Sequence, residues 1–290
     1  MRESEILRII EAQIPAAGDD AASISHGGME LILTTDMLHQ KSDFPAGATP
    51  YTIGWRAVAV SLSDLAAMGA RPLGILLALG DPKLAEETIS GILQGARDCC
   101  HAVGTQLVGG DLDCHQELTL VSTGIGETRR PVLRRGARPG EIVCVTGELG
   151  RTQAGLQLFA RGDYSKANEL FRFTPRITWG QLLADYATSM IDISDGLARS
   201  LYQLAERGAI GFSIEEVTLP IISPLKEILA PADYRSLVLF GGEDYELLFT
   251  IPEESISSLD RQLRISRIGR ASRGGVLLDN RELPNRGYEH

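Results

Sequence analysis

Acidic residues follow small residues at six places where an apolar stretch of this chain ends or is interrupted. Ionised carboxylates are costly to bury unless they are paired or bind a metal ion, so these segments restrict how the chain can fold. If the segments converge in space, they form a site of oxygen ligands suited to Mg²⁺ and phosphate. The six segments are Gly18-Asp19-Asp20, Thr34-Thr35-Asp36, Ser63-Asp64, Gly109-Gly110-Asp111, Asp192-Ile193-Ser194-Asp195-Gly196 and Gly241-Gly242-Glu243-Asp244.

Each of these segments also has a purely structural interpretation. Asp19-Asp20 could form a turn, and Asp195 could cap the helix that follows it. Asp64 lies in an otherwise apolar stretch, where Arg56 or Arg71 could pair with it. Taken one at a time, the segments favour these structural roles. The recurrence of six such segments favours a common site.

The overall composition restricts the class of partner. The chain has 290 residues and a net charge of −10, and it contains no long basic run. Binding to nucleic acid relies on Lys and Arg, so we expect no nucleic-acid partner. No stretch reaches the roughly 18 apolar residues that span a membrane. The charged start, Met1–Leu7, lacks the apolar region of a signal peptide, so we expect a soluble cytoplasmic protein.

The cysteines and histidines show no metal-ligand spacing. No Cys-x-x-Cys pair occurs, which favours reduced, mostly packed thiols over a zinc site or disulfides. The four cysteines are Cys99, Cys100, Cys114 and Cys144.

Apolar and turn patterns predict strands and helices in both halves of the chain. Strands are expected over Met29–Thr35, Pro72–Leu79, Thr105–Val108, Leu118–Gly126, Glu141–Thr146, Ser189–Ile193 and Tyr245–Ile251. Helices are expected from Pro50 to Gly69, from Asp81-Pro82 to Gly104, from Gly150 to Ala160, and from Gly196 to Gly208. The polar segment Arg134–Gly140 is rich in turn residues and marks a domain boundary. We therefore expect two α+β domains, residues 1–135 and 136–290, facing a shared cleft.

The motifs of several common enzyme classes are missing. The chain has no Gly-x-x-x-x-Gly-Lys-[Ser/Thr] loop, no Gly-x-Gly-x-x-Gly, no His-Glu-x-x-His and no Gly-x-Ser-x-Gly. A carboxylate-rich Mg²⁺ site remains, and phosphoryl transfer relies mainly on positioning and charge neutralisation. The pairs Gly109-Gly110 and Gly241-Gly242 would let backbone N–H groups approach phosphate. A non-catalytic nucleotide-binding or sensor protein is the alternative.

The acidic segments belong to longer strings that follow a fixed order along the chain. The strings are Gly18-Asp19-Asp20-Ala21, Thr34-Thr35-Asp36, Ser61-Leu62-Ser63-Asp64-Leu65-Ala66-Ala67-Met68-Gly69-Ala70, Gly109-Gly110-Asp111, Asp192-Ile193-Ser194-Asp195-Gly196-Leu197, Gly241-Gly242-Glu243-Asp244-Tyr245-Glu246-Leu247 and Gly287-Tyr288. In this order they closely resemble the thiamine-monophosphate kinase family, from Glu3 to Tyr288. The resemblance implies the fold of aminoimidazole ribotide synthetase and a homodimer built through the N-terminal sheets. It also implies that ATP phosphorylates thiamine monophosphate directly, giving thiamine diphosphate with the help of several Mg²⁺ ions.

The resemblance further implies roles for individual residues. The positions that match Mg²⁺ ligands are Asp20, Thr34, Thr35, Asp36, Asp64, Asp111, Asp192 and Asp195; of these Asp36, Asp111 and Asp195 match the catalytic core. Positions matching nucleotide contacts are Gly110, Asp111, Arg134 and Ser194, and those matching thiamine contacts are Asp43, Glu243 and Tyr288. Asp43 is a departure, because many members of the family have histidine there. An aspartate would repel the substrate phosphate, so we expect Asp43 to face the cationic rings. Asp19 and Asp244 are expected only to shape their turns.

Relatives of this family with other activities lack support in the sequence. Selenophosphate synthetase is expected to carry a reactive Cys or selenocysteine and a lysine near the N-terminus, and neither occurs here. The hydrogenase-maturation dehydratase ends in a reactive cysteine, whereas this chain ends Gly287-Tyr288-Glu289-His290. The Gly-Val-Gly-Thr-Lys-type segment of aminoimidazole ribotide synthetase is also missing. These differences favour the thiamine kinase.

Overall fold

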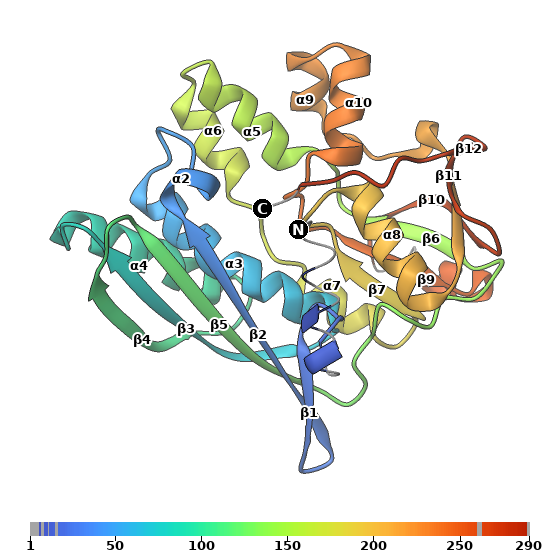
Figure 1. Ribbon diagram of the computed structural model, residues 1–290, viewed down its shortest axis with the longest axis horizontal. Helices are drawn as coiled ribbons and strands as arrows, with labels where there is room; N and C mark the ends of the chain where they lie inside the picture. Colours follow the sequence, from blue (N-terminus) through green and yellow to red (C-terminus); the bar gives the residue numbers. More distant parts are fainter. Residues whose placement is uncertain (1–5, 7–8, 11, 15–16, 260–262, 289–290) are drawn as a thin grey trace.

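Two mixed β-sheets lie side by side along the long axis of the molecule (Figure 1). The computed structural model describes residues 6, 9–10, 12–14, 17–259 and 263–288, so the charged start Met1–Glu5 lies outside the described residues. The first sheet has the order β1-β2-β5-β3-β4. Its strands are β1 (Ala22–His26), β2 (Met29–His39), β3 (Arg71–Asp81), β4 (Leu107–Cys114) and β5 (Thr119–Thr128). Only the β3–β4 pair is parallel.

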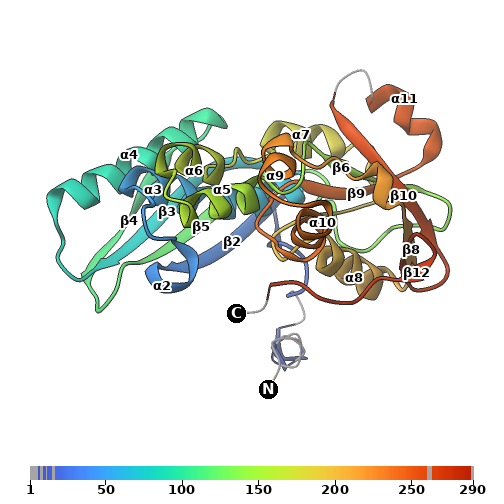
Figure 2. The ribbon, with the colours of Figure 1, turned by 90° about the horizontal axis from the view of Figure 1, so that it is seen from above.

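Two long helices cover one face of the first sheet (Figure 2). Helix α3 (Pro50–Ala67) begins at Thr49, whose side chain accepts a hydrogen bond from the Thr52 N–H, with Pro50 at the first helical position. Nearly all of α3 is buried, because the sheet lies on one side of it and α4 (Glu86–Ala102) and α7 (Ile177–Leu183) pack on others. Among the described residues, no long helix covers the opposite face of the sheet (Figure 2).

The second sheet belongs to the C-terminal half, in the order β12-β11-β8-β10-β6-β9-β7. Its strands are β6 (Ile142–Thr146), β7 (Ser189–Asp192), β8 (Gly211–Ile214), β9 (Leu247–Ile251), β10 (Ile265–Ser272), β11 (Val276–Leu278) and β12 (Arg281–Glu282). The other elements are α2 (Gln40–Asp43), α5 (Arg151–Ala160), α6 (Tyr164–Phe171), α8 (Leu197–Gly208), η1 (Glu216–Thr218), α9 (Ser223–Ile228), α10 (Pro231–Phe240), η2 (Glu253–Ser255) and α11 (Ile256–Leu259). Helices α6 and α7 reach back to pack on α3, so the two halves meet along this helix.

The elements expected from the sequence are present, but three boundaries differ by more than two residues. Asp36 lies inside β2 and not at its end, and Gly109-Gly110-Asp111 lies within β4 and not in a turn. A Cβ on Gly110 would lie 1.8 Å from the Leu77 carbonyl oxygen, so this glycine permits close pairing with β3. Helix α4 begins at Glu86 because the Asp81 carboxylate accepts from the N–H groups two and three residues on and holds a turn first.

The structure also shows the state of the thiols and the lengths of the apolar helices. None of the four cysteines, all of them among the described residues, forms a disulfide; Cys99, Cys100 and Cys144 are buried and Cys114 is exposed, as expected for reduced and mostly packed thiols. Burial raises the pKa of the Cys100 thiol to about 12, which keeps it protonated and unreactive. Within the described part of the chain, no helix combines the length and apolarity needed to cross a membrane.

The crossing of α3 and α4 provides a test of the packing. A Cβ on Gly95 of α4 would lie 1.9 Å from the backbone oxygen of Tyr51 in α3. We expect Gly95→Ala to lower the midpoint of thermal unfolding, because overpacking costs about 1–3 kcal/mol and exceeds the helix-propensity gain of about 1 kcal/mol. Circular dichroism melts measure the shift. Gln94→Ala, on the exposed side of α4, is the control and should change little; a stabilised Gly95→Ala protein would contradict the close crossing.

Candidate active site

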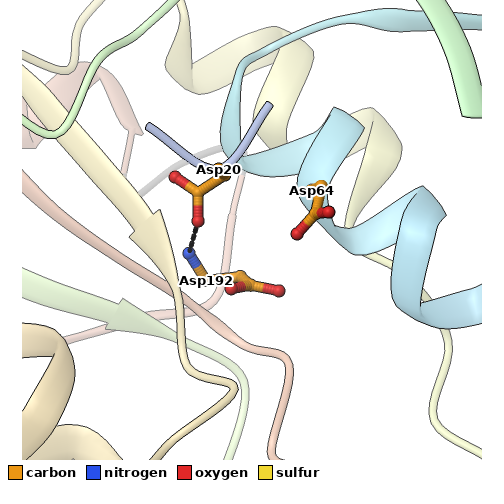
Figure 3. Close-up of side chains that lie close together, drawn as sticks. All are labelled: Asp20, Asp64 and Asp192. Carbon is orange, nitrogen blue, oxygen red and sulfur yellow. Dashed lines mark hydrogen bonds between the residues drawn. The ribbon is translucent and has the colours of Figure 1, made fainter. Parts of the chain in front are cut away.

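Three carboxylates from separate parts of the chain form one cluster. Asp20 precedes β1, Asp64 lies in α3 and Asp192 ends β7 (Figure 3). One oxygen from each carboxylate lies within 4.8 Å of the other two. The Asp192 N–H also donates a 3.4 Å hydrogen bond to Asp20 Oδ1, which links the N-terminal segment to the second sheet. The two halves of the chain therefore meet at an acidic cluster.

Hydroxyl groups orient the buried acids. Thr34 Oγ1 donates to Asp64 Oδ2, and Ser63 Oγ donates to Asp192 Oδ2 at 2.6 Å. Two residues before Ser63 on α3, Ser61 Oγ donates to Asp36 Oδ2 at 2.6 Å. No role was expected for Ser61 or Ser63 from the sequence, although both lie in the string around Asp64. These hydroxyls hold each carboxylate without neutralising its charge.

One guanidinium partly offsets the negative charge. Arg134 Nη2 lies 3.1 Å from Asp20 Oδ1, and the Arg134 N–H donates to Asp19 Oδ1 at 2.8 Å. Burial favours a lower pKa for Arg134, but the ion pair with Asp20 and the nearby charges of Asp192 and Asp64 outweigh it and raise the pKa. Arg134 thus stays charged beside the cluster.

The cluster has the chemistry of a divalent-cation site. Burial, followed by the charges of Asp36, Asp192 and Asp20, raises the pKa of Asp64 well above its ordinary value. Burial and then the charge of Asp20 raise the pKa of Asp192 in the same way. Three close carboxylates with one guanidinium leave an excess of negative charge. Hard oxygen ligands with unbalanced charge fit Mg²⁺.

A pocket joins the acids to the residues expected to contact thiamine. The pocket has a volume of about 170 Å³, and Asp36 and Asp64 line one part of it. Ser194, Asp195, Asp43, Glu243 and Tyr288 line the rest, together with Met37, Leu38, Val60 and Tyr245. A second pocket of about 350 Å³ shares Asp43, Glu243 and Tyr288 with it. The acids and the expected substrate residues thus border connected space.

Backbone hydrogen bonds bring three loops together around this pocket. The Ser194 carbonyl accepts from the Glu243 N–H at 2.5 Å, and the Asp195 carbonyl accepts from the Tyr288 N–H at 3.1 Å. Gly242 has φ +70°, and a Cβ there would lie 2.5 Å from the Ser194 oxygen. Gly242 is therefore needed for close contact between two loops of the protein. The Gly241-Gly242 pair was expected to let the backbone approach a phosphate. The contact with the Ser194 oxygen gives a second, structural reason for glycine at position 242.

Neither of the two arginines considered as alternative partners of Asp64 pairs with it. Arg56 pairs with Glu243 at 2.6 Å, and Arg71 pairs with Glu127. Asp64 instead accepts from the Thr34 hydroxyl. Sequence spacing suggested these arginines only because they flank Asp64, whereas the helix points Arg56 toward a loop 187 residues away.

Two further acids, Asp244 and Asp43, have different contacts. Asp244 Oδ1 accepts from the N–H groups of Gly150 and Arg151 at 2.7 and 3.1 Å, so it holds the start of α5 as a turn-shaping residue. Asp43 accepts from the His39 N–H at 2.6 Å and also lines both pockets. Burial, then the charges of Asp43 and Glu243, raises the pKa of Tyr288, so the Tyr288 hydroxyl stays protonated at neutral pH.

Asp111 lies away from the acidic cluster of its own chain. Asp36 in β2 pairs with Ser122 in β5, which pairs with Leu77 in β3. Leu77 pairs in turn with Gly110 in β4, so Gly110 lies three strand spacings, or roughly 14 Å, from Asp36. Asp111 belongs to the next row, with Ala78 and Met37, on the face of the sheet opposite α3. Thr35 also points to that face, where its hydroxyl lies 3.2 Å from that of Thr123. Within one chain, Asp111, Gly110 and the Thr35 side chain do not join the cluster.

The chain was compared with known proteins. Residues 18–128 match the family described as AIR synthase related protein, N-terminal domain. Thiamine-monophosphate kinase from Halobacterium salinarum is 43% identical over 294 residues, covering 100% of both chains. The enzyme of the same name from Methanospirillum hungatei is 43% identical over 300 residues, covering 100% of this chain and 99% of the other. The chain belongs to the thiamine-monophosphate kinase family.

Solved structures agree with this assignment. The structure described as AaThiL complexed with AMPPCP and TMP is 31% identical, with a TM-score of 0.92 over 100% of this chain and 97% of that chain. The HypE–HypF complex is 20% identical with a TM-score of 0.73, so it shares the fold alone. The resemblance and the fold class expected from the sequence are confirmed for this thiamine-monophosphate kinase family member.

The acidic cluster predicts how stability depends on pH. Asp64 and Asp192 have pKa values raised well above the ordinary 3.8, so the folded state holds their protons more tightly than the unfolded chain does. Their contribution to the free energy of unfolding is full below pH 3.8 and is lost as pH rises through the raised pKa values. We expect Asp192→Asn to reduce this loss, measured as the thermal midpoint without divalent cations from about pH 4 to about pH 8.

Magnesium should act in the same experiment. Added Mg²⁺ is expected to raise the midpoint of the unsubstituted protein near neutral pH, because a ligand of the folded state stabilises it. The increase should be smaller for Asp192→Asn. Asp185→Asn, at an exposed position, is the control. Identical pH and Mg²⁺ responses in all three proteins would rule out the cluster as a cation site.

Proposed function

We propose that this protein transfers the γ-phosphoryl group of ATP to the phosphate of thiamine monophosphate, forming thiamine diphosphate and ADP. The observation that carries the proposal is the full-length match to a structure described as complexed with AMPPCP and TMP, at a TM-score of 0.92. The acidic cluster and the adjoining pockets supply the charge and the space that this reaction requires.

The reaction needs no strong general base, because the acceptor is an anionic oxygen of the substrate phosphate. That oxygen forms a bond to the γ-phosphorus, and the bond to the β–γ bridging oxygen breaks, leaving ADP with the electron pair. Bound Mg²⁺ ions would offset the charge of the two polyanions and of the transferred group. The residues that would hold them are Asp20, Thr34, Asp36, Asp64, Asp192 and Asp195, with Thr35 and Asp111 as further ligands.

The nucleotide and thiamine would bind at opposite ends of the cluster. Arg134 and Ser194 lie beside the acids and would contact ATP, because a guanidinium and a hydroxyl group suit phosphate oxygens. Glu243, Asp43 and the Tyr288 ring line the pockets farther along. Two carboxylates and an aromatic face suit the cationic rings of thiamine. This assignment would keep Asp43 away from the substrate phosphate.

A homodimer would complete the site. The face of the first sheet opposite α3 exposes large apolar side chains, among them Met37 at 58%, Val108 at 55% and Leu76 at 40%. Exposed apolar surface of this kind marks an interaction site, and β4 is an outermost strand of its sheet among the described residues. A second copy covering this face would bring its Gly110 and Asp111 toward β2 of the first copy, the strand that carries Asp36. The separation of Asp111 from the cluster within one chain supports this arrangement.

The division into domains 1–135 and 136–290 stays part of the proposal. The first sheet ends with β5 at Thr128 and the second begins with β6 at Ile142, which favours a boundary between them. The first domain would bind ATP and Mg²⁺ and form the dimer, and the second would complete the cleft. The cytoplasmic location expected from the sequence also stays a prediction.

The activity can be tested by coupling ADP formation to an optical signal. We expect ADP only when thiamine monophosphate, ATP and Mg²⁺ are all present, with free thiamine as the inactive acceptor control. Asp36→Asn should lower kcat by about a hundredfold or more, the loss expected when transition-state charge stabilisation is removed. Asp185→Asn should behave as the unsubstituted protein. ADP formation independent of thiamine monophosphate would exclude the proposed substrate.

The shared site predicts complementation between inactive subunits. Asp36→Asn and Asp111→Asn proteins should each be inactive alone. Mixed dimers, isolated through two different affinity tags, would contain one site with both aspartates intact and recover up to about half the activity. Sites formed within single chains would recover nothing on mixing, and a monomer by light scattering would likewise exclude the dimer.

A further inference from the structure

Arg56 is a fully buried cation that no part of the proposed reaction uses. It lies in α3, its exposed fraction is 0%, and it is among the largest side chains with no exposure. Burial of a guanidinium is costly unless its charge is paired and its N–H groups are satisfied. The partners of Arg56 therefore indicate its purpose.

The surroundings of Arg56 hold its guanidinium in one place. Nη1 donates to the Phe171 carbonyl at 3.0 Å, and the guanidinium carbon lies 3.9 Å from the centre of the Phe171 ring. The rings of Phe173 and Tyr245 each lie 5.5 Å away, and they stack on one another with centroids 4.2 Å apart. Three aromatic rings and a carbonyl thus fix the direction in which Nη2 points.

Nη2 of Arg56 points at one oxygen of Glu243. The distance from Arg56 Nη2 to Glu243 Oε1 is 2.6 Å. The Arg56 side chain is 1% exposed, whereas that of Glu243 is 24% exposed and lines both pockets. The carboxylate therefore bridges a buried cation and the space where substrate would bind. With Oε1 held from behind, the other oxygen is the one available to the pocket.

The backbone of Glu243 is held separately from its carboxylate. Glu243 has φ +64° and Tyr245 has φ +52°, in the left-handed region that costs non-glycine residues about 1–3 kcal/mol. The Glu243 N–H is bonded to Ser194 and its carbonyl accepts from Thr152 Oγ1 at 2.6 Å. These bonds fix the backbone but leave the side chain free to rotate. Arg56 supplies the contact that fixes the carboxylate.

We propose that Arg56 is a positioning residue, which orients the Glu243 carboxylate so that its second oxygen receives the cationic part of thiamine monophosphate. This inference rests on the proposed function, because it takes the substrate to be a phosphorylated cation. Arg56 does not itself touch the substrate. Arg56 also limits the negative charge of the pocket. This matters because Asp43 and Glu243 line a pocket that a substrate carrying a phosphate must enter.

The first test separates substrate binding from chemistry. We expect Arg56→Gln to raise KM for thiamine monophosphate about tenfold or more, the effect of losing roughly one charge-assisted contact, while KM for ATP changes less than about twofold. Arg56→Lys should lie between, because lysine keeps the charge but not the planar geometry. Calorimetry with thiamine monophosphate alone should show the same order of affinities.

The second test asks whether Arg56 acts through Glu243. Glu243→Gln should raise KM for thiamine monophosphate, and adding Arg56→Gln to it should cause little further change, because the carboxylate to be oriented is gone. Arg172→Gln is the matched control: Arg172 donates to Thr52 at 2.9 Å nearby, and among the described residues it forms neither a hydrogen bond nor an ion pair with Glu243. Its KM should equal that of the unsubstituted protein.

Several outcomes would overturn the inference. Equal effects of Arg56→Gln with and without Glu243→Gln would show that Arg56 acts independently of that carboxylate. A lower thermal midpoint for Arg56→Lys with an unchanged KM would show that Arg56 only stabilises the fold. These results differ from failure of the proposed function, in which the unsubstituted protein itself would form no ADP in response to thiamine monophosphate.

Discussion

The mutual repulsion of buried carboxylates is the constraint on which this structure depends. Asp20, Asp64 and Asp192 come from the N-terminal segment, a helix and the second sheet, and their oxygens approach within 4.8 Å. Such a cluster opposes folding unless hydroxyls, a guanidinium and a bound cation compensate for it. The rest of the fold provides the first two: α3 supplies serine hydroxyls, and the segment after β5 supplies Arg134.

Helix α3 connects the two ends of the proposed site. Toward its C-terminal end it carries Ser61, Ser63 and Asp64 beside the acids, and two turns earlier it carries Arg56 behind Glu243. The helix is buried by the first sheet, by α4 and by α7, so its side chains have little freedom to move apart. A rigid element of this kind keeps metal-binding and substrate-binding groups at a constant separation, as phosphoryl transfer requires.

The sequence predicted much of the fold, and its motif strings included the three acids, Asp20, Asp64 and Asp192, that the structure brings together. Local pattern could not place Asp36 and Asp111 within strands, because glycines usually mark turns and only the β3 carbonyl at Leu77 explains Gly110. The side of the sheet on which Asp111 lies relative to Asp36 depends on how four strands are ordered. Pairing between segments far apart in the sequence determines that order. The pairing of Arg56 with Glu243 could not be found from the sequence for the same reason: the two residues lie 187 positions apart, and no spacing rule connects them.

The two buried arginines divide the charge of the pocket in different ways. Arg134 offsets one carboxylate of a group of three, which leaves a negative excess that a divalent cation can satisfy. Arg56 instead pairs with a single carboxylate, so the substrate end holds an ion pair with one oxygen facing the pocket. Complete neutralisation at the acidic end would weaken attraction for metal, and an unpaired Glu243 would repel the substrate phosphate. The different numbers of acids around the two arginines therefore suit one end to a metal-bound polyanion and the other to an organic cation.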